Sequence, residues 1–435
     1  MQKSVCEHLG LLWMQGALAP RVDNKVTLAR RTSFALTCIG IHDKGINPIA
    51  SIGTIKCYVE PRLLTGLNAT VLNSVKIKEL DRFYHKLARQ IQGIPMNAAK
   101  EATYLFLNTL PVECLHHLRI MEMFGQICRL PENHTVNNVA LRQLAVKTDK
   151  SKSWFIHSCK IGEHYGLNLY QEFQNPSTQL VWKNTVKKAI YSQCFTDMVE
   201  SAKQKSTLEW VIFELLAHDH PHSIWTESKT LYQTEAARTR LKMLIGRYGF
   251  GKEIKRYIAS TDTQCPMCTE EVEDVEHFLT NCPPVLRKTG SLVNRLSKVY
   301  TDAELTPPCH RREIVSAILN GAGYQKYQGT LGKLTGIVIK LPKGSIKQAS
   351  LICNHIVSTS HRLRDEALGV QRLECIKCKV PVEDDDRAIT CDDCERWQHI
   401  VCNNIITDEE YDNALDGISN LEWCCPRCTN AKSKA

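Results

Sequence analysis

Long apolar runs are missing from this 435-residue sequence. No uncharged apolar stretch approaches the ~18 residues that a membrane-spanning helix needs, so we expect no membrane partner. The apolar segment near the amino terminus is preceded by Glu7 and His8 and interrupted by Gln15, which argues against a signal peptide. Repeats of fixed period and low-complexity tracts are also absent. With 43% hydrophobic and 23% charged residues, the composition predicts an ordinary folded protein of two or three domains.

The sequence also lacks the patterns that catalysis would need. It shows no catalytic triad, no glycine-rich phosphate loop and no set of zinc ligands with an open coordination position. Adjacent aspartates occur at residues 384–386 and 392–393, inside cysteine-rich sequence. We therefore predict that the protein is not an enzyme.

Charge is unevenly distributed along the chain. Residues 371–435 hold 8 Lys and Arg against 14 Asp and Glu, a net charge of −6, whereas residues 1–370 hold 47 against 32, a net charge of +15. A basic segment attracts phosphate polyanions, and an acidic segment attracts cationic peptides. The alternative is that both segments are merely solvated surfaces.

Helical periodicity dominates residues 1–260, most clearly over residues 74–92. There, apolar residues recur every three or four positions on one side of the predicted helix: Ile77, Leu80, Tyr84, Leu87 and Ile91. Basic residues occupy the other side: Lys76, Lys78, Arg82, Lys86 and Arg89. Gly93 and Pro95 should end the helix. The basic side is by default a solvated helix surface, and nucleic-acid contact is the alternative.

Further helices are predicted from apolar periodicity around Leu115–Phe124, Leu208–Leu216 and Ile314–Leu319. Regular strand alternation is scarce. The sequence therefore predicts a mainly α body.

A first group of metal-type residues lies within this body. Cys265, Cys268, His277 and Cys282 offer three thiols and an imidazole, the ligand set of a closed structural zinc site, so we expect one Zn²⁺ there. Nearby basic residues make an approach to this site that favours nucleic-acid binding: Arg240, Lys242, Arg247, Lys252, Lys255 and Arg256.

A second group closes the chain as four pairs of ligands. Two ligands separated by two residues can bind one face of a tetrahedral ion, so four pairs supply complete shells for two Zn²⁺ ions. The eight residues are Cys375, Cys378, Cys391, Cys394, His399, Cys402, Cys425 and Cys428. Because so short a segment buries little apolar surface, the metal should supply most of its stability, on the order of 10–16 kcal/mol per structural zinc. Ile389, Ile400 and Trp423 are its predicted core.

The order of these ligands resembles a PHD finger. Histidine stands fifth, and Trp423 precedes Cys425 by two positions, whereas a RING domain would place its histidine fourth. The resemblance implies a small zinc-stabilised α+β fold in a nuclear protein. It also implies interleaved ligation, in which the first zinc is bound by Cys375, Cys378, His399 and Cys402 and the second by Cys391, Cys394, Cys425 and Cys428.

PHD fingers commonly bind a histone tail, so the resemblance implies a basic peptide as partner. Trp397 stands where methyl-lysine readers place one wall of an aromatic cage, although a structural role for this tryptophan is the alternative. The loop before Cys391 supplies acidic residues instead of further aromatics: Asp384, Asp385 and Asp386. Carboxylates can hydrogen-bond an ammonium group, which favours an unmodified or weakly methylated lysine.

The body resembles a second family, the non-LTR retrotransposon reverse transcriptases. Segments that match the region after the polymerase palm, and then the thumb, lie at residues 7–10, 29–36, 45–48, 58–67, 93–95 and 110–113. The stretch from Cys265 to Pro283 resembles the zinc-binding tail of the same family. This resemblance implies contact with RNA or DNA. The paired aspartates of the palm are absent, so we expect no polymerase activity.

These observations predict a reader of a basic peptide with a retroelement-derived body. The alternative is a remnant or carboxyl-terminal fragment of a reverse transcriptase, in which the finger is a structural or protein-interaction module. The predicted divisions are a thumb-like region, a helical connector, the first zinc site, a helical linker region and the PHD finger, at residues 1–145, 146–260, 261–285, 286–370 and 371–430.

Overall fold

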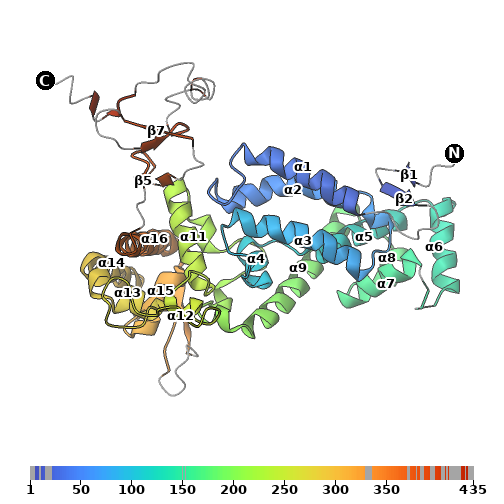
Figure 1. Cartoon of the computed structure of the whole chain (residues 1–435). Helices are drawn as coiled ribbons and strands as arrows, with labels where there is room; N and C mark the ends of the chain where they lie inside the picture. The colour runs from blue at the N-terminus through green and yellow to red at the C-terminus, as the bar shows by residue number, and fades with distance from the viewer. Residues whose placement is uncertain are drawn as a thin grey trace.

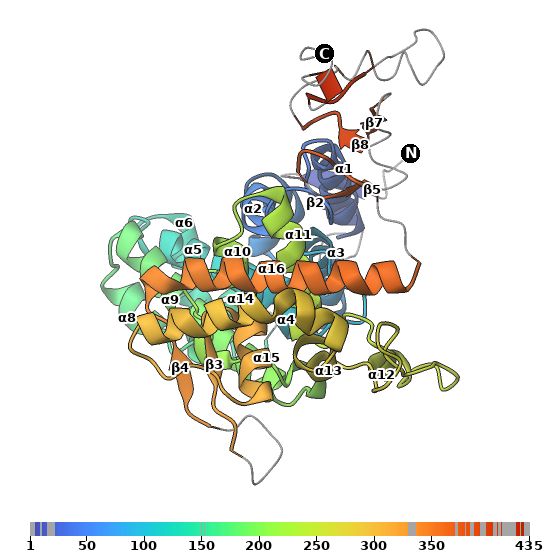
Figure 2. The same cartoon turned by 90° about the vertical axis from the view of Figure 1, so that its left-hand side faces the viewer.

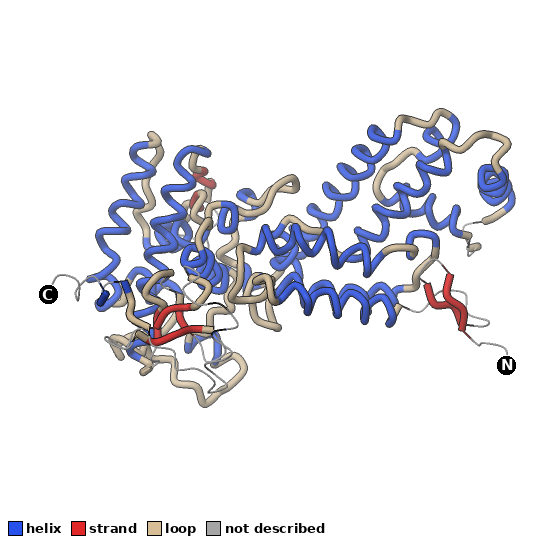
Figure 3. Tube along the Cα trace, turned by 90° about the horizontal axis from the view of Figure 1, so that it is seen from above, coloured by secondary structure: helices blue, strands red, loops and turns tan. Residues whose placement is uncertain are grey.

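The computed structural model describes most of the chain. The described residues are 5–8, 11–14, 22–148, 150–151, 153–328, 336–369, 373–378, 380–382, 387–391, 397–402, 407, 410, 423–426 and 428–429. Helices dominate them, and the strands form only short antiparallel pairs (Figure 3), which confirms the prediction of a mainly α body.

The helices follow one another through the body with short connections. The first nine are α1 (Asp23–Thr37), α2 (Pro48–Leu64), α3 (Ser74–Ile91), α4 (Lys100–Leu107), α5 (Val112–Cys128), α6 (Thr135–Val146), α7 (Trp154–His164), α8 (Leu169–Gln174) and α9 (Gln179–Lys203). The others are α10 (Ser223–Thr226), α11 (Leu231–Leu244), α12 (Gly251–Ile254), α13 (Val275–Thr280), α14 (Pro283–Asp302), α15 (Arg311–Asn320) and α16 (Lys343–Ala367). No described helix combines the length and apolar content that crossing a bilayer demands.

The strands pair in sequence order. The pairs are β1 (Val5–His8) with β2 (Leu11–Met14), β3 (Gly323–Gln325) with β4 (Val338–Lys340), β5 (Leu373–Glu374) with β6 (Pro381–Val382), and β7 (Ala388–Thr390) with β8 (Trp397–His399).

Helix α3 matches its predicted range. The Asn73 side chain caps its start by accepting a hydrogen bond from the backbone N–H of Lys76 at 3.0 Å, and Gly93, with φ of +63°, follows its end. The apolar side faces the core as expected. The assignment of Arg89 to the solvated basic side was wrong. Its side chain is buried and donates to the carbonyl oxygen of Met96 at 2.8 Å, because the chain folds back over it after the helix.

The prediction of a helix around residues 208–216 was also wrong. Two 3₁₀ turns, η2 (Ser206–Leu208) and η3 (Phe213–Leu215), stand there instead. The buried Asn320 amide explains the irregular backbone. It donates to the carbonyl oxygen of Trp210 at 3.0 Å and accepts from the N–H of Ile212 at 3.2 Å, so it takes over bonds that a helix would make internally. The predicted helices around 115–124 and 314–319 are confirmed as parts of α5 and α15.

Two helical halves share one hydrophobic core. Helices α1–α9 lie in one half of the body and α11–α16 in the other (Figure 1). Helix α10 lies at the junction, because it contacts α2 and α4 of the first half and α11 and α16 of the second. A single cluster of buried side chains runs from Val22 to Val357. Polar bonds reinforce the junction, since the Asn47 amide donates to Trp225 O at 2.9 Å and Arg238 donates to Gly45 O at 3.0 Å.

The two long helices α14 and α16 pack side by side in the second half (Figure 2). Cys282 is the N-cap residue of α14, and Arg364 lies in the last turn of α16. The first group of metal-type residues is therefore built into the helical packing.

Candidate metal centres

The structure brings the first four predicted ligands together. The Sγ atoms of Cys265 and Cys282 are 3.8 Å apart, and Sγ of Cys268 is 3.3 Å from Nε2 of His277. All four ligand atoms lie within 4.8 Å of one another. Zinc–sulfur bonds of about 2.3 Å at tetrahedral angles place sulfur ligands about 3.8 Å apart. The cluster therefore has the size and the donor set for one Zn²⁺ ion.

Local hydrogen bonds explain why the chain turns back at this point. The backbone N–H of Cys265 donates to Glu271 O at 2.8 Å, and Thr269 takes a positive φ of 58° in the turn between them. Asp274 caps α13 by accepting from the N–H of His277 at 2.9 Å, which directs the imidazole toward the cysteines. The N–H of Cys282 then donates to His277 O at 2.8 Å.

Glu271 fixes the orientation of the histidine. Its Oε2 atom lies 2.9 Å from Nδ1 of His277, so Nδ1 carries the proton and Nε2 faces the cysteines as an acceptor. Carboxylates that hold a metal-binding histidine in this way strengthen metal affinity. Sequence spacing did not identify Glu271, because it belongs to no ligand pair.

The cluster is largely sealed inside the body. Cys265 and Cys282 are fully buried beside Val285, and Leu363 of α16 packs against them. Burial raises the pKa of the Cys282 thiol to about 12, so a thiolate at this position needs a bound cation to stabilise it.

An ion pair fastens the same loop to α16. The Arg364 guanidinium binds the Glu273 carboxylate through two contacts, at 2.5 and 3.0 Å, and Glu273 also accepts from the N–H of Gly251 at 2.8 Å. The guanidinium stacks over Tyr248, 5.2 Å from the ring centroid. The metal loop and the last helix of the body are thus one packed unit.

The predicted basic approach to this cluster is smaller than the sequence suggested. Arg240 is fully buried and donates to the backbone and side-chain oxygens of Ser350 at 3.2 and 3.1 Å. Its inclusion among surface basic residues was wrong, because α11 packs this side against α16. Lys252 forms an ion pair with Asp274 at 2.7 Å.

The carboxyl-terminal segment contains two more clusters. Cys375, Cys378, His399 and Cys402 have their ligand atoms within 4.8 Å of one another, with Nδ1 of His399 at 3.3 Å from Sγ of Cys378. Contacts with Cys378 and then Cys402 lower the pKa of the Cys375 thiol, which favours its thiolate form. Backbone bonds from Cys375 to Val380 O and from Ile376 to Trp397 O hold the pairs β5–β6 and β7–β8 together at this cluster.

The other cluster joins Cys391, Cys425 and Cys428, again within 4.8 Å. Its predicted fourth member, Cys394, lies outside the described residues. The first pair along the chain therefore meets the third, and Cys391 of the second pair meets the fourth, as in the interleaved arrangement. Trp423 is buried against Cys391 and Cys425, and Ile400 is buried as well, as expected for the small core.

Of the four predicted peptide-contacting residues, one lies among the described residues. Trp397 lies in β8, half-buried, two residues before His399. Asp384, Asp385 and Asp386 lie outside the described residues.

Together these features define a cross-braced zinc finger at the carboxyl end of a helical body. Residues 372–432 match a family described as "Pygopus, PHD-type zinc finger". The chain thus carries a PHD-type finger, and its Cys and His clusters point to Zn²⁺ as the metal. Neither a curated protein nor a solved structure matches the chain.

Proposed function

We propose that the protein is a zinc-dependent, non-catalytic reader of a basic peptide, such as a histone tail, and that it acts in the nucleus. The observation that carries this proposal is the pair of interleaved clusters inside the segment that matches a PHD-type finger. In this proposal each finger zinc has the four ligands predicted from the sequence, including Cys394. The metal holds a rigid surface and takes no part in a reaction.

The peptide would add to the finger as a further strand. In this proposal the peptide pairs with a strand edge of the finger, where each described strand has a single partner strand in its sheet. Trp397 would contact the lysine side chain, and Asp384, Asp385 and Asp386 would attract its ammonium group. The acidic net charge of residues 371–435 supports a cationic partner.

Titration of the full chain with basic tail peptides tests this proposal. Peptides with an unmodified, monomethylated or trimethylated lysine should bind in decreasing order of affinity. Trp397→Ala should weaken binding at least tenfold with zinc content unchanged. Val401→Ala is the matched control, because Val401 is 70% exposed on the same finger. Absence of binding to every basic peptide would contradict the reader function.

A second proposal concerns the body, which we infer to derive from the thumb and zinc-binding tail of a non-LTR reverse transcriptase and to bind RNA or DNA. Its net charge of +15 and the exposed side chains of Lys78, Arg82 and Lys86 on α3 favour this activity. Affinity for a nucleic acid should fall steeply with salt. Replacing the three α3 residues by glutamine should reduce the slope of log K against log salt by roughly 2 to 3, as each lost phosphate contact removes about 0.7 to 0.9. Salt-independent binding, or an unchanged slope, would contradict it.

A further inference from the structure

A cavity of about 520 Å³ lies between α2 and α9, away from the metal clusters. This volume is in the range of small-molecule sites. Its walls come from four separate stretches of the chain: the start of α2, the end of α4, the middle of α9 and the loop at residues 218–221. The site therefore cannot be recognised from any one segment of the sequence.

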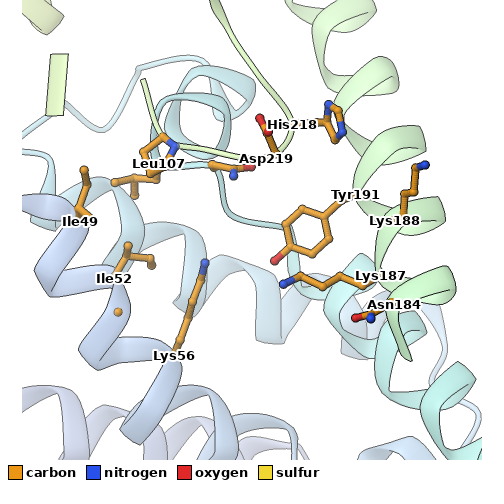
Figure 4. A pocket seen from close by; sticks show the side chains of 13 residues that line it. Ile49, Ile52, Lys56, Leu107, Asn184, Lys187, Lys188, Tyr191, His218 and Asp219 are labelled. Carbon is orange, nitrogen blue, oxygen red and sulfur yellow. The ribbon is translucent and has the colours of Figure 1, made fainter. Parts of the chain in front are cut away.

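Three lysines line the cavity. Lys56 extends from α2, and Lys187 and Lys188 extend from α9, with the amino groups of Lys56 and Lys187 directed toward the same space (Figure 4). Within the described part of the chain, none of the three lysines forms an ion pair with a carboxylate. The charges of Lys56 and Lys187 repel one another across this space, so an anion placed between them would be stabilised.

Two acidic side chains lie near these lysines, and each is bonded to another residue. Asp219 lines the cavity, but its carboxylate is 2.7 Å from Nδ1 of His220. Glu60, one turn beyond Lys56, accepts a hydrogen bond from the Tyr84 hydroxyl at 2.5 Å. Burial lowers the pKa of Lys56, Glu60 raises it, and the charge of Lys187 lowers it again. An anion placed beside Lys56 would therefore favour its charged form, which burial and the charge of Lys187 disfavour.

Apolar side chains line the same cavity. Ile49 and Ile52 lie on α2, as Lys56 does, Leu107 and Pro221 line the cavity with them, and the Tyr191 ring extends from α9 beside Lys187 (Figure 4). Burial, followed by the charge of Glu60, raises the pKa of Tyr191 to about 12, so its hydroxyl stays protonated and can donate to an anion. The cavity thus offers both ammonium groups and apolar side chains to a ligand.

We propose that this cavity binds a nucleoside phosphate, with the phosphate between Lys56 and Lys187 and the base against Ile49, Ile52 and Leu107. The same chemistry is offered by a free nucleotide and by the 5′-phosphorylated end of a nucleic-acid strand. The site is independent of the zinc finger and of the basic face of α3.

Gly53 permits a test that leaves the lysines in place. It lies on α2 among the lining residues, and a Cβ atom built there meets no other atom within 4 Å. Gly53→Ala should therefore fold and keep binding, whereas Gly53→Glu adds a carboxylate at the same position. Lys203→Ala controls for loss of a positive charge, because Lys203 lies on α9 outside the cavity.

Binding of AMP, adenosine and pyrophosphate to the full chain by calorimetry tests the proposal. AMP should bind to the unaltered protein at least tenfold more tightly than adenosine and more tightly than pyrophosphate. Gly53→Glu and the double variant Lys56→Met/Lys187→Met should each weaken AMP binding at least tenfold, while Gly53→Ala and Lys203→Ala stay within twofold. Absence of saturable AMP binding to the folded protein, or equal affinity in Gly53→Ala and Gly53→Glu, would overturn the proposal.

The source of the phosphate is resolved by comparing AMP with a 5′-phosphorylated dinucleotide. Tighter binding of the dinucleotide identifies a strand end as the ligand, and tighter binding of AMP identifies a free nucleotide. Because α3 is unchanged in all these variants, they leave nucleic-acid binding through that helix intact. The proposal for α3 is therefore tested independently of the proposal for the cavity.

Discussion

Glu271 Oε2 lies 2.9 Å from Nδ1 of His277, on the ring edge opposite Cys268. The exposed carboxylate therefore orients a buried imidazole toward the metal cluster.

Glu271→Ala should weaken zinc binding at this cluster by about 10- to 100-fold, because the imidazole loses the partner that fixes its tautomer. Competition with a chelator, followed by native mass spectrometry, measures the effect as one zinc ion lost at a lower chelator concentration. Glu270→Ala is the control, since Glu270 is exposed and adjacent. Equal zinc retention in the two variants would show that the contact is unimportant.

Arg364→Met should reduce the free energy of unfolding by about 3–5 kcal/mol, because it leaves the Glu273 carboxylate buried without its cation. The side chains of Arg364 and Glu273 are 14% and 4% exposed. Denaturant unfolding of the zinc-loaded protein provides the measurement.

The same helix supplies a control for this substitution. Arg362 pairs with Glu366 at 3.7 Å, and both side chains are more than half exposed. Arg362→Met should change stability by about 0.5 kcal/mol or less. Similar losses in both variants would mean that the cost comes from the helix and not from the buried ion pair.

Acid should destabilise the body through His222. Its side chain is fully buried, Nδ1 accepts from the N–H of Ile224 at 3.2 Å, and burial, aided by the charge of Arg240, lowers its pKa to about 3. Below the unfolded pKa of about 6.5 the unfolded chain takes up a proton that the folded chain does not. Stability is therefore lost as pH falls from 6.5 toward 3, by about 1.4 kcal/mol per pH unit.

His222→Asn isolates this contribution, because asparagine also caps a helix start and does not titrate. The stability advantage of the unaltered protein over the variant should shrink by about 2 kcal/mol between pH 6.5 and pH 5. Denaturant unfolding at the two values with zinc in excess measures it. Parallel pH profiles would contradict the assignment.

The metal clusters were predictable from the sequence, since ligand pairs such as Cys265 and Cys268 are local and their spacing is fixed by tetrahedral geometry. Helix α3 was predictable as well, because its apolar periodicity lies within one continuous segment of the chain. The burial and contacts of side chains that pack against distant segments were not predictable from the sequence. From the sequence, Arg240 was expected at the surface. Only the packing of α16 against α11 places Ser350 in contact with it.

The same limit applies to the irregular segment at 208–216 and to the lysine cavity. Asn320 replaces helical hydrogen bonds from more than a hundred residues away, and Lys56 meets Lys187 only through the packing of α2 near α9. The resemblance of the body to a polymerase thumb stays a prediction, because it depends on short sequence matches alone.

Zinc stoichiometry tests the central claim most directly. Native mass spectrometry of the folded full chain should show three zinc ions, two removed together from the finger and one held by the Cys265–Cys282 cluster. Cys394→Ser should reduce zinc retention in the finger, whereas Cys309→Ser, at an exposed cysteine outside the clusters, should leave three ions. A well-folded chain that carries no metal would contradict the account.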